Sequence, residues 1–202
     1  SSKQEKDCLT YKCFTNNFKN TDHIKHICTE DDFSVIASSS EQHVQIVCDM
    51  TSFCDELSPH NSNYDELTCK KKFMKLITEL LKHLQRCRRL ILLTSSFLSR
   101  LNAGILYILA RSFYTTTIKC KANLWLHQFV VLDDYLGVGP TLINHLTDTT
   151  DKLIDSEVNN RQTTVTEVLK FSSLLNDRKF VQFVTAYNNF TVTGFINKML
   201  HH

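Results

Sequence analysis

The sequence predicts an α/β fold, a single domain with a central, mostly parallel sheet flanked by helices. Three features between Phe73 and Asp134 predict it: an amphipathic helical pattern, and two short apolar runs on either side of a second such pattern. Runs of this kind are typical of strands that are buried on both faces. Two strands joined through a helix make a βαβ unit, which needs a parallel sheet with helices on its faces.

The first helix of this segment is predicted from apolar residues at helical spacing, and it is expected to end in positive charge. Its apolar positions are Phe73, Ile77, Leu80, Leu81 and Leu84. The run Arg86-Cys87-Arg88-Arg89 follows, and basic residues suit the negative end of a helix dipole. Leu90 to Leu93 is then wholly apolar and predicts a buried strand.

A second helix is predicted directly after this strand. Thr94-Ser95-Ser96 supplies a turn and a candidate N-cap. The amphipathic pattern that follows has its apolar positions at Leu98, Leu101, Ile105, Ile108 and Leu109. The second apolar run, Leu124 to Leu132, is expected to be the next strand of the sheet.

The segment before Phe73 predicts one strand and one long loop. Gln42 to Asp49 alternates as a strand, with Val44, Ile46 and Cys48 on one face. Met50 to Lys72 is polar, and long loops without secondary structure are often functional. Residues 50–70 are therefore a candidate binding element, although a disordered insertion fits the composition equally well.

The C-terminal part of the chain predicts mostly helices. Gly137 to Pro140 indicates a turn before a helix from Thr141 to about Ile154. Val165 to Leu175 has helical spacing, whereas the clustered apolar residues of Phe180 to Ala186 resemble a strand. Thr193 to Leu200 is expected to close the chain as a helix.

Length and composition fit one domain with an adequate core, since the chain has 202 residues and is 42% hydrophobic. Residues 43–202 are expected to form the α/β core. Residues 1–42 are expected to be an irregular N-terminal extension that could supply the first strand and helix of the same domain, with strands over 9–14 and 33–37. No apolar run reaches the ~20 residues that a membrane helix needs, and the polar N-terminus does not resemble a signal peptide.

The cysteines leave two interpretations open. Their number, 8, is even and suits a secreted disulfide scaffold. A content of only about 4% is low for such a scaffold, and we expect an intracellular, cytoplasmic protein with reduced thiols. The residues suited to bind zinc are Cys8, Cys13, His23, His26 and Cys28. Their spacing is looser than that of zinc sites, so we expect no metal there.

A phosphate loop is present only in part. Gly137 and Gly139 lie between a predicted strand and a predicted helix, where phosphate-binding loops occur. The third glycine of the dinucleotide fingerprint is absent, and no Lys-Ser or Lys-Thr follows as in a P-loop. We expect a plain turn and no cofactor.

A divalent metal site is also incomplete. Asp49-x-Thr51 resembles the start of a von Willebrand A metal site, but Phe53 stands where a second hydroxyl is needed. Asp133 and Asp134 could add carboxylates from a neighbouring strand end. A degenerate or metal-dependent enzyme, von Willebrand A-like or nuclease-like, is therefore the alternative function.

Charge is distributed unevenly along the chain. No Asp or Glu occurs from Arg86 to Leu132, and the basic residues there are Arg86, Arg88, Arg89, Arg100, Arg111, Lys119 and Lys121. The loop after the strand at 44–49 is acidic. A basic face and an acidic loop could pair head to tail between copies, or they could simply be solvated. The candidate interaction residues are Asp55, Glu56, Asp65, Glu66, Arg86, Arg88, Arg89, Arg100 and Arg111.

Nucleic acid is not expected as a partner, because Trp125 and Phe129 fall in a predicted core strand.

Residues 84–98, LQRCRRLILLTSSFL, resemble the segment that precedes and forms the third strand of Toll/interleukin-receptor (TIR) domains. Residues 101–118 then match the next helix, Trp125 to Asp133 the fourth strand, and Thr193 to Leu200 the closing helix. On the same alignment Val44 to Asp49 is the second strand, and 50–70 is the loop through which TIR domains commonly associate. The resemblance implies a TIR/flavodoxin-like fold and a signalling scaffold or adaptor.

The chain departs from the TIR pattern at one informative place. TIR domains usually carry a tryptophan and an acidic residue in the helix after the third strand, and the acid is catalytic in members that cleave NAD. Residues 99–117 contain neither. The resemblance therefore implies a divergent, non-catalytic module that associates with itself or a related domain through the 50–70 loop and a basic helix face.

Overall fold

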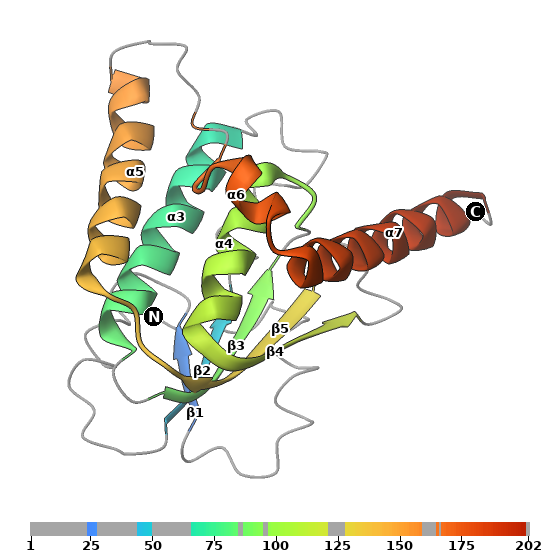
Figure 1. Ribbon diagram of the computed structural model, residues 1–202, viewed down its shortest axis with the longest axis horizontal. Helices are drawn as coiled ribbons and strands as arrows, with labels where there is room; N and C mark the ends of the chain where they lie inside the picture. The colour runs from blue at the N-terminus through green and yellow to red at the C-terminus, as the bar shows by residue number, and fades with distance from the viewer. Residues whose placement is uncertain are drawn as a thin grey trace, which may run out of the picture.

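The computed structural model describes residues 24–27, 44–49, 66–84, 87–94, 97–120, 128–158, 165 and 167–200. Along the chain the elements are β1 (Ile24–Ile27), β2 (Val44–Asp49), α3 (Glu66–His83), β3 (Cys87–Thr94), α4 (Arg100–Ser112), β4 (Phe113–Cys120), β5 (Gln128–Tyr135), α5 (Pro140–Val158), α6 (Phe171–Leu175) and α7 (Arg178–Leu200). Figure 1 shows α3, α4 and α5 stacked on one side of a single sheet, while α7 projects away from it. None of the described helices is long and apolar enough to cross a membrane.

The sheet is mixed rather than mostly parallel in its pairing. Its five strands lie in the order β1-β2-β3-β5-β4. The pairs β1–β2 and β2–β3 are parallel, whereas β5 is antiparallel to both of its neighbours, β3 and β4. The predicted α/β class is thus confirmed. The flavodoxin-like order is 2-1-3-4-5, and the observed strand order differs from it.

The predicted βαβ unit was wrong in its second strand. The chain leaves α4 directly into β4, where a continuation of the helix to residue 118 was expected, and only then forms β5. Thr115, Thr116, Thr117 and Ile118 explain the strand, because β-branched side chains lose rotamer freedom in a helix and fit a pleated strand. The apolar run near residue 130 is a strand, but it runs against β3.

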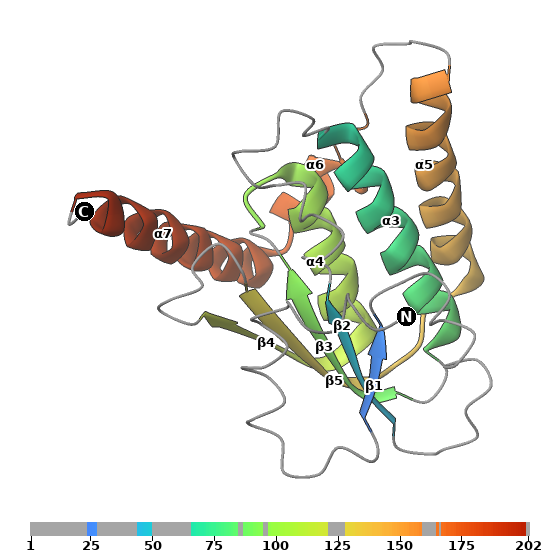
Figure 2. The same ribbon diagram turned by 180° about the vertical axis from the view of Figure 1, so that it is seen from behind.

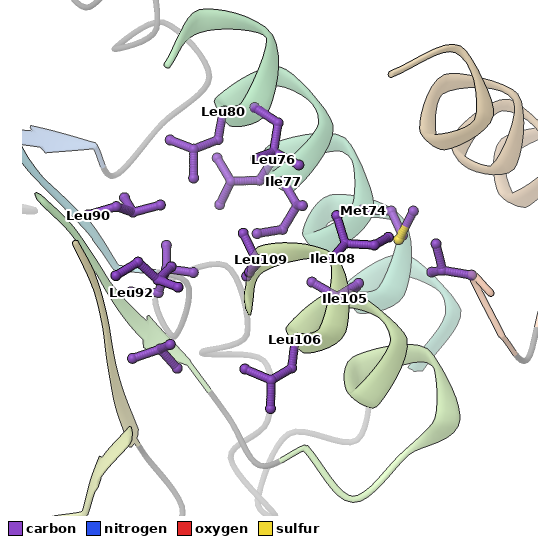
Figure 3. Packing of buried hydrophobic residues seen from close by; sticks show 14 of the residues in the cluster. Met74, Leu76, Ile77, Leu80, Leu90, Leu92, Ile105, Leu106, Ile108 and Leu109 are labelled. Atoms are coloured by element: carbon purple, nitrogen blue, oxygen red, sulfur yellow. The ribbon is translucent and has the colours of Figure 1, made fainter. Parts of the chain in front are cut away.

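The core lies between the sheet and the helices. Figure 3 shows Leu76 and Leu80 of α3 and Leu109 of α4 directed towards Leu90 and Leu92 of β3. The residues of β2 and β3 that alternate with this core face, Val47, Ile91 and Leu93, are buried as well. The prediction that β3 is buried on both faces is therefore confirmed. In β2, which was predicted as an alternating strand, Ile46, Val47 and Cys48 are all buried.

The boundaries of α3 and α4 differ from the prediction. The basic residues in the last turn of α3 are Lys82 and His83, while Cys87 to Arg89 already lie in β3. The N-cap of α4 is Ser99, whose hydroxyl accepts a hydrogen bond from Asn102 N at 3.1 Å. Thr94, part of the predicted cap, is a buried strand residue.

The predicted strand at 180–186 is wrong, because these residues lie inside α7. Phe180, Tyr187 and Thr191 are buried, and Val184 packs against the core. Their spacing of three and four residues is helical. The exposed apolar residues between them hid this period in the sequence.

Two further C-terminal predictions hold in part. The helix after the glycine turn is confirmed as α5, and Gly137 has a φ of 91°, which requires a glycine at this turn. The helix predicted over 165–175 is reduced to α6.

The predicted strands at 9–14 and 33–37 lie outside the described residues, but β1 shows that part of the segment 1–42 belongs to the sheet.

A buried leucine and an exposed leucine, six residues apart in the sequence, test whether β3 is packed in the core. Leu92 is 1% exposed within β3, and Leu98 is 53% exposed before α4. We expect Leu92→Ala to lower the free energy of unfolding by about 3 kcal/mol, as for other buried leucines. Leu98→Ala should change it by less than about 0.5 kcal/mol. Urea denaturation measures both, and equal effects would contradict the packing.

Candidate interaction surface

The C-terminal helix α7 packs against the core only through part of its length. It leaves the body beside α6 and runs outwards, with the end of the chain at its free tip (Figures 1 and 2). Its charged residues are Arg178, Lys179 and Lys198, and it contains no acid. The remaining positions are apolar or neutral.

The first half of α7 is anchored on the body by aromatic contacts. The rings of Phe180 and Tyr107 meet edge to face with centroids 4.8 Å apart, and those of Tyr187 and Phe97 with centroids 6.1 Å apart. Phe180 and Tyr187 are buried. Such aromatic pairs contribute beyond the area that they bury, so they fix the direction in which α7 leaves the body.

The second half of α7 exposes an apolar stripe. The exposed apolar residues are Phe190, Val192, Ile196, Met199 and Leu200, and the last two expose 64% and 76% of their surface. Val192, Ile196, Met199 and Leu200 have the i, i+4, i+7, i+8 spacing of one helix face, and such an apolar face normally packs against other protein. Contiguous exposed apolar surface of this kind marks interaction sites.

The start of α7 is held by Asp177. Its Oδ1 accepts a hydrogen bond from Phe180 N at 3.1 Å, which caps the helix. Its Oδ2 accepts one from Arg111 Nη2 of α4. The backbone hydrogen bond from Phe180 and, more weakly, the pairing with Arg111 hold the pKa of Asp177 below its ordinary value, although burial opposes them.

Both arginines of α4 contact the C-terminal segment. Arg111, near the helix end, also lies over the Tyr107 ring with its guanidinium carbon 5.4 Å from the centroid. Arg100, at the helix start, lies 5.0 Å over the Phe171 ring of α6. Of the five predicted basic interaction residues, Arg100 and Arg111 lie on a described helix. These two residues contact α6 and the residue before α7.

Arg89 is likewise engaged within the chain. Its Nε lies 2.5 Å from Asp133 Oδ1, and the two residues face each other across the β3–β5 ladder. This hydrogen bond raises the pKa of Arg89. Arg88 precedes it in β3.

The other predicted interaction residues are not brought together by the described part of the chain. Asp55, Glu56, Asp65 and Arg86 lie outside the described residues. Glu66 is the first residue of α3. The last part of the predicted loop 50–70 is therefore helical.

Two acidic residues of the predicted metal site, Asp49 and Asp133, occupy register positions near opposite ends of β3. Asp49 pairs with Leu93 near one end of β3, whereas Asp133 pairs with Arg89 near the other. At 3.3 Å per residue this separates them by about 13 Å along the strand. They cannot bind one ion together. Within the ranges that the structure describes, no group of three or more His, Cys, Asp or Glu could hold a metal.

No protein-family model matches this chain, and no curated protein matches it either. The resemblance to TIR domains therefore rests on residues 84–98 and on the predicted order of elements. The sequence analysis did not predict the exposed apolar surface of α7. The signal that could have identified it is the acid-free stretch from Arg178 to Leu200, which is rich in apolar residues.

Replacing Asp177 should loosen the start of α7. In Asp177→Ala the Phe180 amide and the Arg111 guanidinium both lose their acceptor. The carboxyl has a lower pKa in the folded chain than in the unfolded one, where it is about 3.9. Its stabilisation is therefore present above about pH 4 and is lost as the pH falls through the native pKa. We expect Asp177→Ala to unfold at lower urea concentration than wild type at pH 7, with a difference that shrinks below pH 4.

Asp177→Asn separates the two roles of this side chain, because an asparagine still caps a helix but carries no charge. If the cap dominates, Asn retains most of the stability that Ala loses. Hydrogen exchange at the Phe180 amide gives a local measure. Equal protection of this amide in wild type and Asp177→Ala at pH 7 would contradict the assigned contact.

Proposed function

We propose that this domain is a non-catalytic protein–protein interaction module that docks through the free half of α7. The single observation that carries this proposal is the exposed apolar surface of Phe190, Val192, Ile196, Met199 and Leu200. Association would bury these side chains, and burial of apolar surface is the main favourable term in most protein–protein association.

The composition of α7 indicates the chemistry of the partner. Exposed side chains such as Ile196 and Met199 favour an apolar groove, as in complexes where one helix lies in a groove of another protein. The charged residues in the sequence of α7 are all basic, and the helix has no acid. An apolar groove with an acidic rim would complement both properties.

The anchored half of α7 supports this function by ordering the docking half in advance. The Asp177 cap and the buried ring of Tyr187 hold the helix on the body. A docking element that is already helical loses less conformational entropy on binding than a disordered peptide. In this proposal Arg100 and Arg111 are positioning residues, and they act through the segment that they hold.

The acidic loop 50–70 and the basic residues Arg86 and Arg88 remain part of the proposal as a second, electrostatic contact. A signalling adaptor of TIR type is the role that the resemblance of residues 84–98 implies, and it stays a prediction. The alternative, a metal-dependent enzyme, has less support, because Asp49 and Asp133 lie far apart along β3.

Charges placed on the free half of α7 should abolish binding while the fold persists. Ile196 and Met199 are three residues apart and share a helix face. We expect Ile196→Asp/Met199→Asp to retain wild-type stability, because both side chains are exposed. Proteins captured by the wild-type domain should be lost by this variant, and a purified partner should bind at least about tenfold more weakly by calorimetry.

Leu98→Asp is the matched control, since it charges an exposed apolar side chain that lies outside α7. It should capture the same proteins as wild type. An identical set of captured proteins for all three forms, with equal affinities for a purified partner, would refute the assignment of this surface.

A further inference from the structure

We propose that a second copy of this chain is a partner of the domain and that the two copies pair antiparallel along β4 across a two-fold axis. This inference rests on the proposed function, because it names a partner for the same interaction module. The backbone of β4, the side chains on it and the position of α7 each point to it.

β4 is the outermost strand of the described sheet. It pairs with β5 on one side, and on its other side no described strand follows (Figure 2). Natural edge strands are usually protected by charges, prolines or bulges. Phe113–Cys120 contains no proline, and Lys119 is its one charged residue. Its pairing with β5 is uninterrupted from Thr115 to Cys120.

The hydrogen-bond pattern identifies the backbone groups that face outwards. Leu136 N donates to Ser112 O at 2.8 Å, so these two residues form a hydrogen-bonded antiparallel pair. Beyond this pair the ladder is interrupted at Tyr114 and Asp134, where Asp134 has a positive φ of 57°, and it resumes from Thr115 to Cys120. Along the resumed ladder every second residue of β4 directs its N–H and C=O groups away from β5, where a further strand could bind them.

A two-fold axis at Thr116 gives favourable pairs along the whole strand. Thr115 of one copy then lies opposite Thr117 of the other, and Tyr114 lies opposite Ile118. Aromatic–β-branched pairs and threonine pairs both stabilise antiparallel sheets. Lys119 meets no like charge in this register. Tyr114 is 75% exposed, so its ring is available for this contact.

Thr116 itself lies on the proposed axis. Its Oγ1 is buried and has no hydrogen-bond partner in the part of the chain that the structure describes. A change of χ1 would turn this hydroxyl towards the edge, where the symmetry places the same hydroxyl of the second copy. Two threonine hydroxyls can satisfy each other, since each is both donor and acceptor.

The direction of α7 fits the same partner. In Figures 1 and 2 the free end of α7 extends beyond the sheet on the side that ends in β4. A copy added at β4 would approach from this side. The exposed apolar residues of α7 would then lie next to the second copy rather than in open solvent.

A charge exchange tests the pairing and its register. In Thr115→Lys/Thr117→Lys, two lysines face each other at both symmetric positions. In Thr115→Lys/Thr117→Glu, each lysine faces a glutamate instead. Sedimentation velocity over a range of concentrations should show a wild-type dimer. The first variant should raise the dimer Kd at least about tenfold, and the second should stay near wild type.

Hydrogen exchange supplies a second measurement that does not depend on a variant. The β4 amides that are not bonded to β5 should exchange quickly in dilute protein and slowly in concentrated protein. The alternate amides, which are bonded to β5, should be protected at every concentration. Circular dichroism and urea denaturation establish that both variants fold.

Three results would overturn the β4 dimer: a wild-type monomer at every concentration, equal dimerisation of the two charged variants, or edge amides protected in the monomer. The proposed function is decided separately by Ile196→Asp/Met199→Asp. A monomer whose capture of another protein depends on α7 would overturn only the dimer. A dimer that is lost in the lysine pair, with capture unaffected by the α7 variant, would support the dimer and overturn the α7 docking role.

Discussion

The antiparallel pairing of β5 with β3 and β4 determines most of what is specific to this fold. Because β5 returns between two strands that run the same way, its acidic end lies beside the beginning of β3. Asp133 therefore neutralises Arg89 instead of meeting Asp49. The same insertion displaces β4 to the margin of the sheet. One pairing thus places Asp49 and Asp133 far apart in the register and leaves β4 at the edge of the described sheet.

Helix α4 connects this sheet to the C-terminal segment. Its apolar face, with Ile105 and Leu109, packs against the sheet and α3. Its other face holds the C-terminal segment through Tyr107 and Arg111. At Gly104 an added Cβ would lie 3.6 Å from Leu169 N, so the chain crosses this helix in close contact. The helix that positions α7 is therefore itself fixed by the core.

The sequence was informative where burial decides the structure. A run such as Leu90 to Leu93 is apolar because both faces of β3 are covered, and it predicts a strand whatever the direction of its neighbours. For the same reason it cannot reveal that direction. β4 escaped prediction because an edge strand such as Phe113–Cys120 has one exposed side and threonines instead of apolar alternation. The contact between Arg111 and Asp177 joins residues 66 positions apart, and no local pattern encodes it.

The candidate surface was hidden for a related reason. Apolar residues that face the body, such as Phe180 and Tyr187, alternate in α7 with apolar residues that face solvent. A helix with both kinds shows no clear amphipathic period, and its first turns resemble a strand. The charged residues, by contrast, were easy to identify, but their contacts within the chain were not predicted. Arg89, Arg100 and Arg111 contact this chain, and opposite charge inside a fold looks the same in a sequence as opposite charge between molecules.

The uncovered half of α7 also has a consequence for the life of the protein in a cell. Chaperones and proteases act on chains that transiently expose apolar surface. Met199 and Leu200 present such surface in the folded chain. A newly made copy that has not met its partner would resemble a damaged protein to this machinery. Under the proposed docking role, the abundance of the chain should therefore follow the supply of the partner, because unassembled copies would be degraded and assembled ones would persist.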